Sequence, residues 1–286
     1  MAQATISGYA PVGGTDVYWE SWGPEDGDPL VLLHGGYGLA SDFHEFRARV
    51  GACGADGAGG PGAQPGRRFI GVELDGHGRT RLSGRPPRWE TLGDDVAAVL
   101  RHLGLTSADV LGYSLGGGAA LRCAIQHPSL VRHLVLLSAP HRRDGWFPGV
   151  RAGFDGMSGD TLFGLLSQSP LYGAWVSIAP EPDSFPALID ANGELLRRPY
   201  DWSLEVSSLP MPVLLAYGDA DSISPAAAAE FFALLGGGQR DAGWDGSARP
   251  ASRLAILPGV THYNILGAAP LAGIVADFLL AGPLMP

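Results

Sequence analysis

Charge is scarce in this chain of 286 residues, and most of it has one sign. Asp, Glu, Lys and Arg together make up 17% of the residues, and 29 acidic side chains against 19 basic ones give a formal charge of −10. No block rich in Lys and Arg interrupts this acidic character. Because an acidic surface repels phosphate backbones and anionic lipid headgroups, we expect no nucleic acid and no membrane surface among the partners.

Cysteine and long apolar runs are also rare. The two cysteines, Cys53 and Cys123, provide no disulfide framework, and a pair of free thiols is typical of a cytoplasmic protein. No apolar run approaches the roughly 20 residues that a membrane span needs, and the first residues lack the basic and apolar regions of a signal peptide. We therefore expect a soluble, cytoplasmic protein, and a homo-oligomer is compatible with all of this.

Apolar residues make up 45% of the chain and are arranged in short runs that alternate with longer amphipathic segments. This pattern is typical of strands joined by crossover helices. Most of the short runs are near-continuous in Val, Leu and Ile, which indicates parallel strands buried on both faces, and the first strand pair is expected to run antiparallel at one edge. The expected strands are 16–22, 30–33, 69–74, 108–113, 134–138, 213–217 and 253–257. The expected helices are 41–50, 92–103, 115–126, 226–235 and 270–280.

Three stretches break this alternation. Residues 51–67 are rich in Gly, Ala and Pro and are expected to form a flexible surface loop, and 236–250 form a second surface excursion. Residues 141–208 lie between two expected strands, are far longer than an ordinary crossover and are rich in aromatic residues. Because long unstructured loops are uncommon in compact domains, we predict a helical cap at 141–208 on a core formed by 1–140 and 209–286.

The strongest chemical signal is GYSLGG at 112–117, which follows an expected strand and begins an expected helix. A G-x-S-x-G motif in this context places its serine on a sharp, strained turn, so the residues two before and two after it must be small. Gly112 and Gly116 meet that need. Ser114 is thus the candidate nucleophile, and the N–H of Leu115 is a candidate donor to an oxyanion, helped by the helix dipole. The alternative is a Gly-rich turn that carries an incidental serine.

A second motif is LVLLHGG at 30–36, an apolar strand that ends in His-Gly-Gly. Acyl transfer by such a serine needs a second N–H donor at the oxyanion, contributed by the loop after the third strand. Glycine lets the backbone approach a ligand without a Cβ in the way, so the N–H of Gly36 is the candidate donor. For His34 itself we expect a role in ordering the loop.

Two later motifs supply an acid and a base. GDAD at 218–221 follows a buried strand, where a carboxylate can orient a histidine and fix its tautomer. Asp221 is the favoured acid, and Asp219 is the alternative that could instead bond backbone N–H groups. GVTH at 259–262 places His262 five residues beyond an expected strand and ahead of the last helix.

On these motifs, in this order, the chain resembles the α/β-hydrolase superfamily over nearly its full length. The resemblance implies a three-layer α/β fold, with a mostly parallel eight-stranded sheet flanked by helices and a helical cap after the sixth strand. In relatives the later aspartate of the third motif is the usual acid, which supports Asp221. ELDGHGRT at 73–80 resembles the D-x-x-G-x-G-x-S loop of the family but departs from it at Glu73 and Thr80. We interpret that loop as structural.

These features predict a serine hydrolase that cleaves a carboxylic ester of a small, apolar or aromatic molecule. In this mechanism His262 takes the proton of Ser114 and Asp221 stabilises the imidazolium. Lactonase, thioesterase, carbon–carbon bond hydrolase and cofactor-free perhydrolase activities remain alternatives, as does a non-hydrolytic ligand-binding or biosynthetic role. The sequence contains no metal-ligand cluster and no nucleotide motif, so we expect no cofactor and no metal.

Five aromatic residues are candidates for contact with the substrate. Two flank the expected oxyanion site and three belong to the expected cap, where aromatic side chains favour an apolar or aromatic group. The alternative is that all five side chains only pack in the interior, and in particular that those of the cap pack it onto the core. The candidates are Tyr37, Tyr113, Trp146, Phe147 and Trp175.

Overall fold

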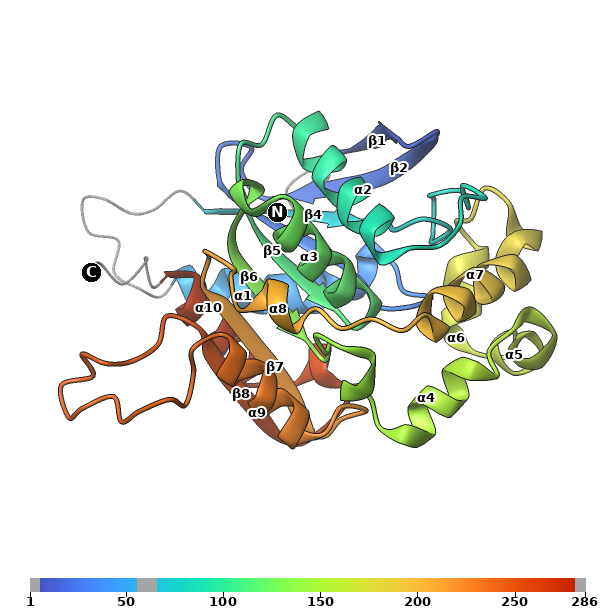
Figure 1. Ribbon diagram of the computed structural model, residues 1–286. Coiled ribbons are helices and arrows are strands. Elements are labelled where there is room, and N and C mark those ends of the chain that lie inside the picture. Colours follow the sequence, from blue (N-terminus) through green and yellow to red (C-terminus); the bar gives the residue numbers. More distant parts are fainter. Residues whose placement is uncertain (1–5, 56–65, 281–286) are drawn as a thin grey trace.

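A computed structural model describes residues 6–55 and 66–280, and the strands in them form one central sheet (Figure 1). The order of its eight strands is β1-β2-β4-β3-β5-β6-β7-β8. β2 pairs antiparallel with both β1 and β4, and all other neighbours pair parallel. The bounds are β1 (Ile6–Val12), β2 (Thr15–Trp22), β3 (Asp28–Leu33), β4 (Arg67–Val72), β5 (Ala108–Tyr113), β6 (Val131–Leu137), β7 (Val213–Ala220) and β8 (Arg253–Thr261).

Helices cover both faces of this sheet, as alternation along the strands requires. In β3, Val31 and Leu33 join one apolar cluster, whereas Leu30 and Leu32 join the cluster on the opposite face. The first face is covered by α2 (Trp89–His102), α3 (Leu115–Gln126) and α9 (Pro225–Leu234), and the second by α1 (His44–Ala55) and α10 (Leu271–Leu280) (Figure 1). The expected three-layer α/β architecture, with its mostly parallel eight-stranded sheet flanked by helices, is therefore confirmed.

The parallel strands all end at the same edge of the sheet, and this places the predicted motifs together. Leu33 pairs with Gly112, and Tyr113 pairs with Leu137. Ala220 at the end of β7 pairs with Thr261 at the end of β8. The loops that follow β3, β5, β7 and β8 therefore meet at the carboxyl edge, where α/β folds bind ligands.

Several predicted boundaries were wrong. The expected loop at 51–67 begins too early, because α1 continues through residue 55 and packs against α10, and residues 56–65 lie outside the described part. β7 and β8 both run further than predicted, because they stay paired across an irregularity near Gly218. His262 consequently follows its strand directly instead of standing five residues beyond it.

The segment 141–208 connects β6 to β7 and is helical. α4 to α7 lie beyond the sheet (Figure 1), and α7 lies beside the loop after β4, where its Leu188 touches Gly76. α8 differs, because Val206 and the preceding Trp202 belong to the apolar cluster of α2 and α3. The bounds are α4 (Pro148–Asp155), α5 (Gly159–Leu166), α6 (Pro170–Val176), α7 (Phe185–Arg197) and α8 (Ser203–Val206). A separate cap with the limits 141–208 stays a prediction.

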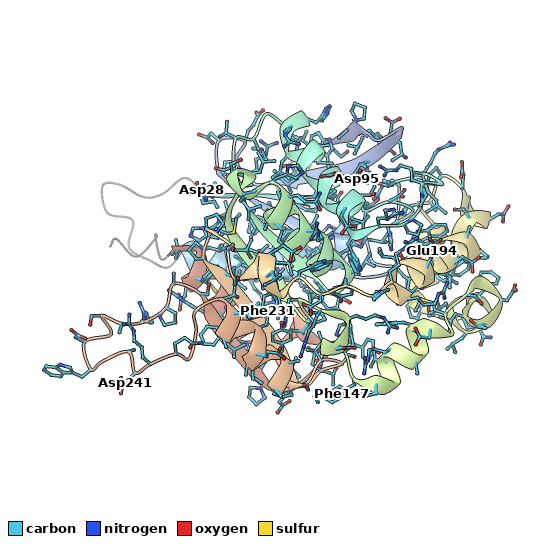
Figure 2. The ribbon with its side chains drawn as sticks, in the orientation of Figure 1. Asp28, Asp95, Phe147, Glu194, Phe231 and Asp241 are labelled. Carbon is cyan, nitrogen blue, oxygen red and sulfur yellow. The ribbon has the colours of Figure 1, made fainter. Side chains whose placement is uncertain are left out.

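The chain between α9 and β8 forms the second excursion predicted from the sequence. It projects from the body (Figure 1), and Asp241 lies on it (Figure 2). Trp244 in this excursion is fully exposed, and its side chain makes no hydrogen bond within residues 6–55 and 66–280.

Candidate active site

Ser114 stands on a strained turn between β5 and α3. Its φ of 52° and ψ of −113° lie in a region that non-glycine residues rarely adopt. The turn also brings backbones close together: a Cβ on Gly112 would lie 2.2 Å from the carbonyl oxygen of Gly116, and one on Gly116 would lie 2.3 Å from that of Leu33. Both glycines are therefore required by space, as the motif predicted.

A chain of hydrogen bonds joins Ser114 to His262 and Asp221. Ser114 Oγ lies 3.0 Å from His262 Nε2, and His262 Nδ1 lies 2.8 Å from Asp221 Oδ1. A carboxylate only accepts, so Nδ1 carries the proton and Nε2 is free to accept from the serine hydroxyl. Asp221 and His262 are 6% and 8% exposed, whereas Ser114 is only partly buried and can be reached from solvent.

Asp221 is held as a carboxylate by the donors around it. Its Oδ2 accepts from Ser138 Oγ at 2.5 Å and from the Gly218 N–H at 3.2 Å, and its Oδ1 accepts from the Ser222 N–H at 2.7 Å. Burial by itself would raise the pKa of Asp221, but the hydrogen bonds from His262, Ser138 and Gly218 hold it below its ordinary value. The histidine therefore faces a permanently ionised partner at neutral pH.

Asp219, the alternative acid, points elsewhere. Its Oδ1 accepts from the N–H of Gly259 at 2.8 Å, and this residue has a φ of +70°. The bond ties the ends of β7 and β8 together. Asp219 thus bonds a backbone N–H group, which is the alternative to the acid role predicted for this aspartate.

The two candidate oxyanion donors lie at the ends of neighbouring strands. Gly36 follows β3 and Leu115 follows β5, and within residues 6–55 and 66–280 neither N–H donates to another group. The carbonyl oxygen of His34 accepts from the Gly116 N–H at 3.0 Å and so links the two loops. Both N–H groups are left available to a ligand.

The side chain of His34 is buried and orders its surroundings. Nδ1 lies 2.8 Å from the carbonyl oxygen of Gly35, and Nε2 accepts from the Leu74 N–H at 3.1 Å. Burial lowers its pKa to about 4, so the ring is neutral.

The five aromatic candidates separate into three groups. Tyr113 donates from its hydroxyl to the carbonyl oxygen of His262 at 2.7 Å, and the Trp146 ring lies 5.5 Å from the His262 ring. Tyr37 and Trp175 lie instead in an apolar cluster with Phe185 of α7, where Trp175 Nε1 also donates to the Gly76 carbonyl oxygen at 3.2 Å.

Phe147 stands apart from the other four, 45% exposed at the start of α4 (Figure 2). The structure therefore brings Tyr113 and Trp146 to the histidine but not Tyr37, Trp175 or Phe147.

Sequence reasoning missed Ser138, which directly follows β6 and donates to the acid. Its φ of 51° is unusual for a non-glycine residue. The sequence offered one signal for this residue, because Ser138 is a polar residue at the end of a continuous apolar run. It also missed Asn264, whose Oδ1 accepts from the Thr261 N–H at 2.8 Å and so fixes the turn that carries His262.

Other kinds of site are absent from the described residues. No group of three His, Cys, Asp or Glu side chains among residues 6–55 and 66–280 could hold a metal ion. Cys53 and Cys123 are both free, the first exposed and the second buried. No helix in this part of the chain has the length and apolar character to cross a membrane.

Comparison with known proteins agrees with the fold. A family model described as the alpha/beta hydrolase fold matches residues 28–251. An AB hydrolase superfamily protein of Bacillus subtilis, YisY, is 30% identical over 70% of this chain and 76% of its own length. A bifunctional esterase/perhydrolase of Acinetobacter calcoaceticus is 30% identical over 44% of this chain. For this and two other curated relatives the match covers only 34% to 42% of their length.

Among solved structures, carboxylesterase CesB of Bacillus subtilis superimposes with a TM-score of 0.71 over 98% of this chain and 93% of its own. Esterase RhEst1 of Rhodococcus sp. gives a TM-score of 0.63 over 98% of this chain and 99% of its own. Sequence identities of 18% and 22% limit both comparisons to the fold.

Proposed function

This chain belongs to the alpha/beta hydrolase fold family, and from that premise we propose that it is a serine esterase. The substrate is a small molecule with a carboxylic ester and an apolar or aromatic group. The observation that carries the proposal is the unbroken hydrogen-bonded chain from Ser114 through His262 to Asp221. A nucleophile, a base and an orienting carboxylate at these distances are the requirement for acyl transfer by serine.

In the proposed reaction, Ser114 attacks the ester carbonyl while His262 Nε2 takes its proton. Asp221 stabilises the resulting imidazolium, and the N–H groups of Gly36 and Leu115 hold the oxyanion. Each such donor is worth roughly 3–4 kcal/mol in comparable sites. The imidazolium then protonates the departing alcohol, and water, deprotonated by His262, releases the acid from the acyl-enzyme.

The surroundings of His262 support an apolar substrate group. The rings of Tyr113 and Trp146 both lie beside its ring, with centroids 5.5 Å away in both cases. We propose that residues 141–208 act as a cap over this site, since α4 to α7 lie beyond the sheet on that side. A cytoplasmic location is part of the same proposal.

The test is steady-state hydrolysis of p-nitrophenyl esters from acetate to octanoate by the wild type and by Ser114→Ala. We expect turnover by the wild type and a loss of at least about 10⁴-fold in kcat for the variant, because the nucleophile is removed. Ser177 is an exposed serine that directly follows α6. The variant Ser177→Ala is the matched control and should retain wild-type rates.

Two results would contradict the proposal. Wild-type activity in Ser114→Ala would exclude Ser114 as the nucleophile. Ligand binding without any turnover, for simple esters and for lactones, thioesters and peracid formation alike, would favour a non-hydrolytic role for the site.

A further inference from the structure

Gly36 differs from the other glycines of the proposed active site, because no neighbour fills the space on its Cα. Chain neighbours aside, no heavy atom in the described part of the chain lies within 4 Å of the position that a Cβ on Gly36 would take. A Cβ on Gly35, Gly112 or Gly116 would instead lie 2.8 Å or less from a neighbouring atom. The φ of Gly36 also lies outside the left-handed region that favours glycine. Among the described residues, neither packing nor backbone conformation therefore requires a glycine at position 36.

The loop that carries Gly36 lies against the nucleophile and is held there. A Cβ on Gly35, the preceding residue, would lie 3.5 Å from the Cβ of Ser114. Tyr37, the following residue, packs its ring against that of Phe185 of α7, with centroids 5.6 Å apart. Because the loop is fixed on both sides of Gly36, the open space at this residue is a built feature of the site beside Ser114.

The order of the strands decides which part of the substrate reaches this space. Ser114 follows β5, and in the sheet β3 lies on one side of β5 whereas β6, β7 and β8 lie on the other. In the proposed reaction His262, which follows β8, protonates the departing alcohol, so the alcohol lies on the side of β8. Gly36 follows β3 and lies on the opposite side. The space at Gly36 therefore faces the acyl part of the substrate.

Within the acyl group, the carbon next to the carbonyl comes nearest to Gly36. In the proposed site the Gly36 N–H donates to the carbonyl oxygen, and this carbon is bonded to the same atom as that oxygen. A Cβ on Gly36 would be bonded to the Cα that carries the donating nitrogen. A branch on the carbon next to the carbonyl and a side chain at position 36 would consequently compete for the same space.

We infer that Gly36 is a specificity-determining residue, and that the space on its Cα receives a branch on the carbon next to the ester carbonyl. The substrate class is thus the esters of α-branched carboxylic acids. This inference rests on the proposed function, since it takes the position of the carbonyl from Ser114 and from the Gly36 N–H. One methylene more or less in an apolar pocket changes kcat/KM by about 10- to 200-fold, so a side chain at position 36 should have a measurable cost for these esters.

The experiment compares isomeric esters that differ only in the position of a methyl branch. The p-nitrophenyl esters of pentanoic, 3-methylbutanoic and 2-methylbutanoic acids share their leaving group and their number of acyl carbons. We expect the wild type to hydrolyse the α-branched 2-methylbutanoate with a kcat/KM within about ten-fold of that for the linear pentanoate. In Gly36→Ala the ratio of these two values should fall by roughly ten-fold, and in Gly36→Val it should fall further. The ratio of 3-methylbutanoate to pentanoate should stay unchanged in Gly36→Ala. A weakened oxyanion donor would slow all three esters alike, so the ratios report the space alone.

Two further glycines provide matched controls. Gly153 of α4 is exposed and also has open space at the position of a Cβ, so Gly153→Ala should keep the wild-type ratios. Gly35→Ala should lower the melting temperature, because its Cβ would meet the Tyr113 ring at 2.8 Å, whereas Gly36→Ala should keep the wild-type value. An equal fall in melting temperature for both variants would mean that position 36 has no room for a side chain, and would overturn the inference.

Esters of branched alcohols test the assignment to the acyl side. Hydrolysis of propyl and isopropyl butanoate is followed by titration of the released acid, and the ratio of the two rates should be the same in the wild type and in Gly36→Ala. A fall in this ratio would place the alcohol at Gly36 and would overturn the inference. Unchanged ratios in both series, or a wild type that rejects 2-methylbutanoate while it hydrolyses pentanoate, would also overturn it and would leave the proposed function intact.

If no ester is turned over, the proposed function fails, and binding decides the inference. Saturation-transfer NMR then compares methyl 2-methylbutanoate with methyl pentanoate on the wild type and on Gly36→Val. Binding of the branched ester that Gly36→Val weakens more than it weakens binding of the linear ester would support the space at Gly36. Equal weakening of both, or no binding of the branched ester to the wild type, would overturn the inference.

Discussion

Asp219 and Asp221 carry the same side chain two positions apart, yet only one of them faces His262. Asp221 has left β7 and lies beside the histidine, whereas Asp219 is still within the strand and bonds Gly259. The chain therefore contains its own matched control for the proposed role of Asp221.

We expect Asp221→Asn to lower kcat for p-nitrophenyl butanoate by about 10⁴-fold, because an amide no longer fixes the histidine tautomer or stabilises the imidazolium. Asp219→Asn should stay within about two-fold of the wild type, since Asp219 makes no contact with His262. Steady-state kinetics at pH 8 measure both. A large loss in Asp219→Asn with a small one in Asp221→Asn would reverse the assignment.

Single residues of the site were predictable where a local motif defines them. Ser114 and His262 each lie in a short sequence motif. The spacing of the residues in each motif reflects the backbone conformation that the side chain requires. Ser138 was not predictable in this way, because its contact with Asp221 joins positions 83 residues apart and depends on how β6 and β7 end side by side.

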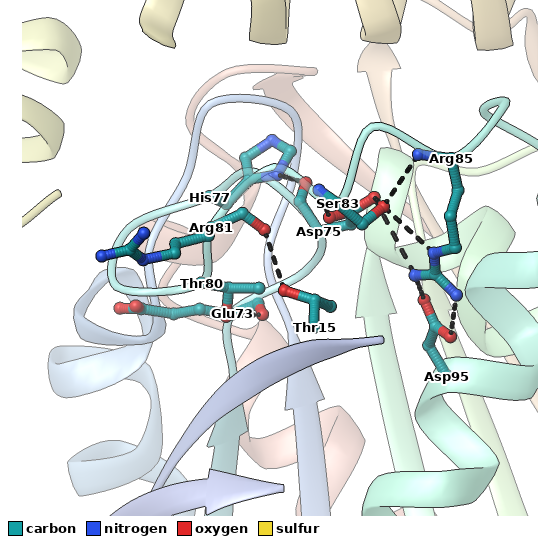
Figure 3. Close-up of polar contacts among 9 residues, drawn as sticks. All are labelled: Thr15, Glu73, Asp75, His77, Thr80, Arg81, Ser83, Arg85 and Asp95. Carbon is teal, nitrogen blue, oxygen red and sulfur yellow. Dashed lines mark hydrogen bonds and ion pairs between the residues drawn. The ribbon is translucent and has the colours of Figure 1, made fainter. Parts of the chain in front are cut away.

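The loop that follows β4 is an element whose stability should depend on pH. The Glu73 carboxylate is fully buried and accepts from the N–H of Arg79 at 2.5 Å and from its guanidinium at 3.0 Å (Figure 3 shows the loop). Burial nevertheless raises the pKa of Glu73 from 4.5 to about 7. The folded state therefore binds more protons than the unfolded state between these values.

The stability contributed by protonated Glu73 is fully present below its unfolded pKa and is lost as pH rises through about 7. We expect the free energy of unfolding of the wild type, relative to Glu73→Gln, to fall between pH 5 and pH 8. The size is about 1–3 kcal/mol, since each pKa unit is worth about 1.4 kcal/mol. Urea unfolding at both pH values measures it, with a substitution of the exposed Glu194 of α7, Glu194→Gln, as control (Figure 2). Parallel pH profiles for wild type and Glu73→Gln would refute the prediction.

Element boundaries were predicted less well than element types. Pro258 and Gly259 in β8 have the composition of a turn, and local propensity ends the strand before them. In the folded chain β8 continues past both residues because β7 continues beside it and supplies partners up to Ala220. Pairing with a strand that is distant in the sequence overrides the local preference to end β8 at Pro258. No local sequence pattern encodes that pairing.

For the molecule as a whole, we expect the excursion between α9 and β8 to be separable from the folded body. It projects into solvent, and its Trp244 is fully exposed (Figure 1). Replacing 239–250 by a short Gly/Ser linker should change the free energy of unfolding by about 1 kcal/mol or less, because loop-closure entropy varies slowly with length. Denaturant unfolding and p-nitrophenyl ester hydrolysis measure the effect.

A matched pair of single variants supports the same comparison. Trp244→Ser should leave stability unchanged, whereas Trp202→Ser, which removes a buried indole from the cluster under α2, should cost about 3–5 kcal/mol. A loss in the shortened chain as large as that of Trp202→Ser would mean that the excursion is part of the folded body.

The fold class was predictable because buried apolar strands alternate with crossover helices along most of the chain. The edge strand β1 (Ile6–Val12) was not among the seven strands expected from this pattern, because it is largely exposed, and the count of eight came from the resemblance. The segment 141–208 was predictable as an insertion by its length and aromatic content, but not in its packing. Trp202 contacts the main body while Trp175 joins a cluster with α7, and nothing local to either tryptophan distinguishes the two.

Ser114, His262 and Asp221 lie far apart in the sequence, and their spacing has a consequence during synthesis of the protein on the ribosome. Ser114 and His262 are separated by 148 positions, and His262 follows the last strand of the sheet. At about 5–20 residues per second, a ribosome that has made the proposed nucleophile needs roughly 7 to 30 s more to make its base. If the proposed mechanism holds, every nascent chain in that interval carries an unactivated hydroxyl, hydrolysis begins only when synthesis has passed β8, and activity reports the arrival of the final strand.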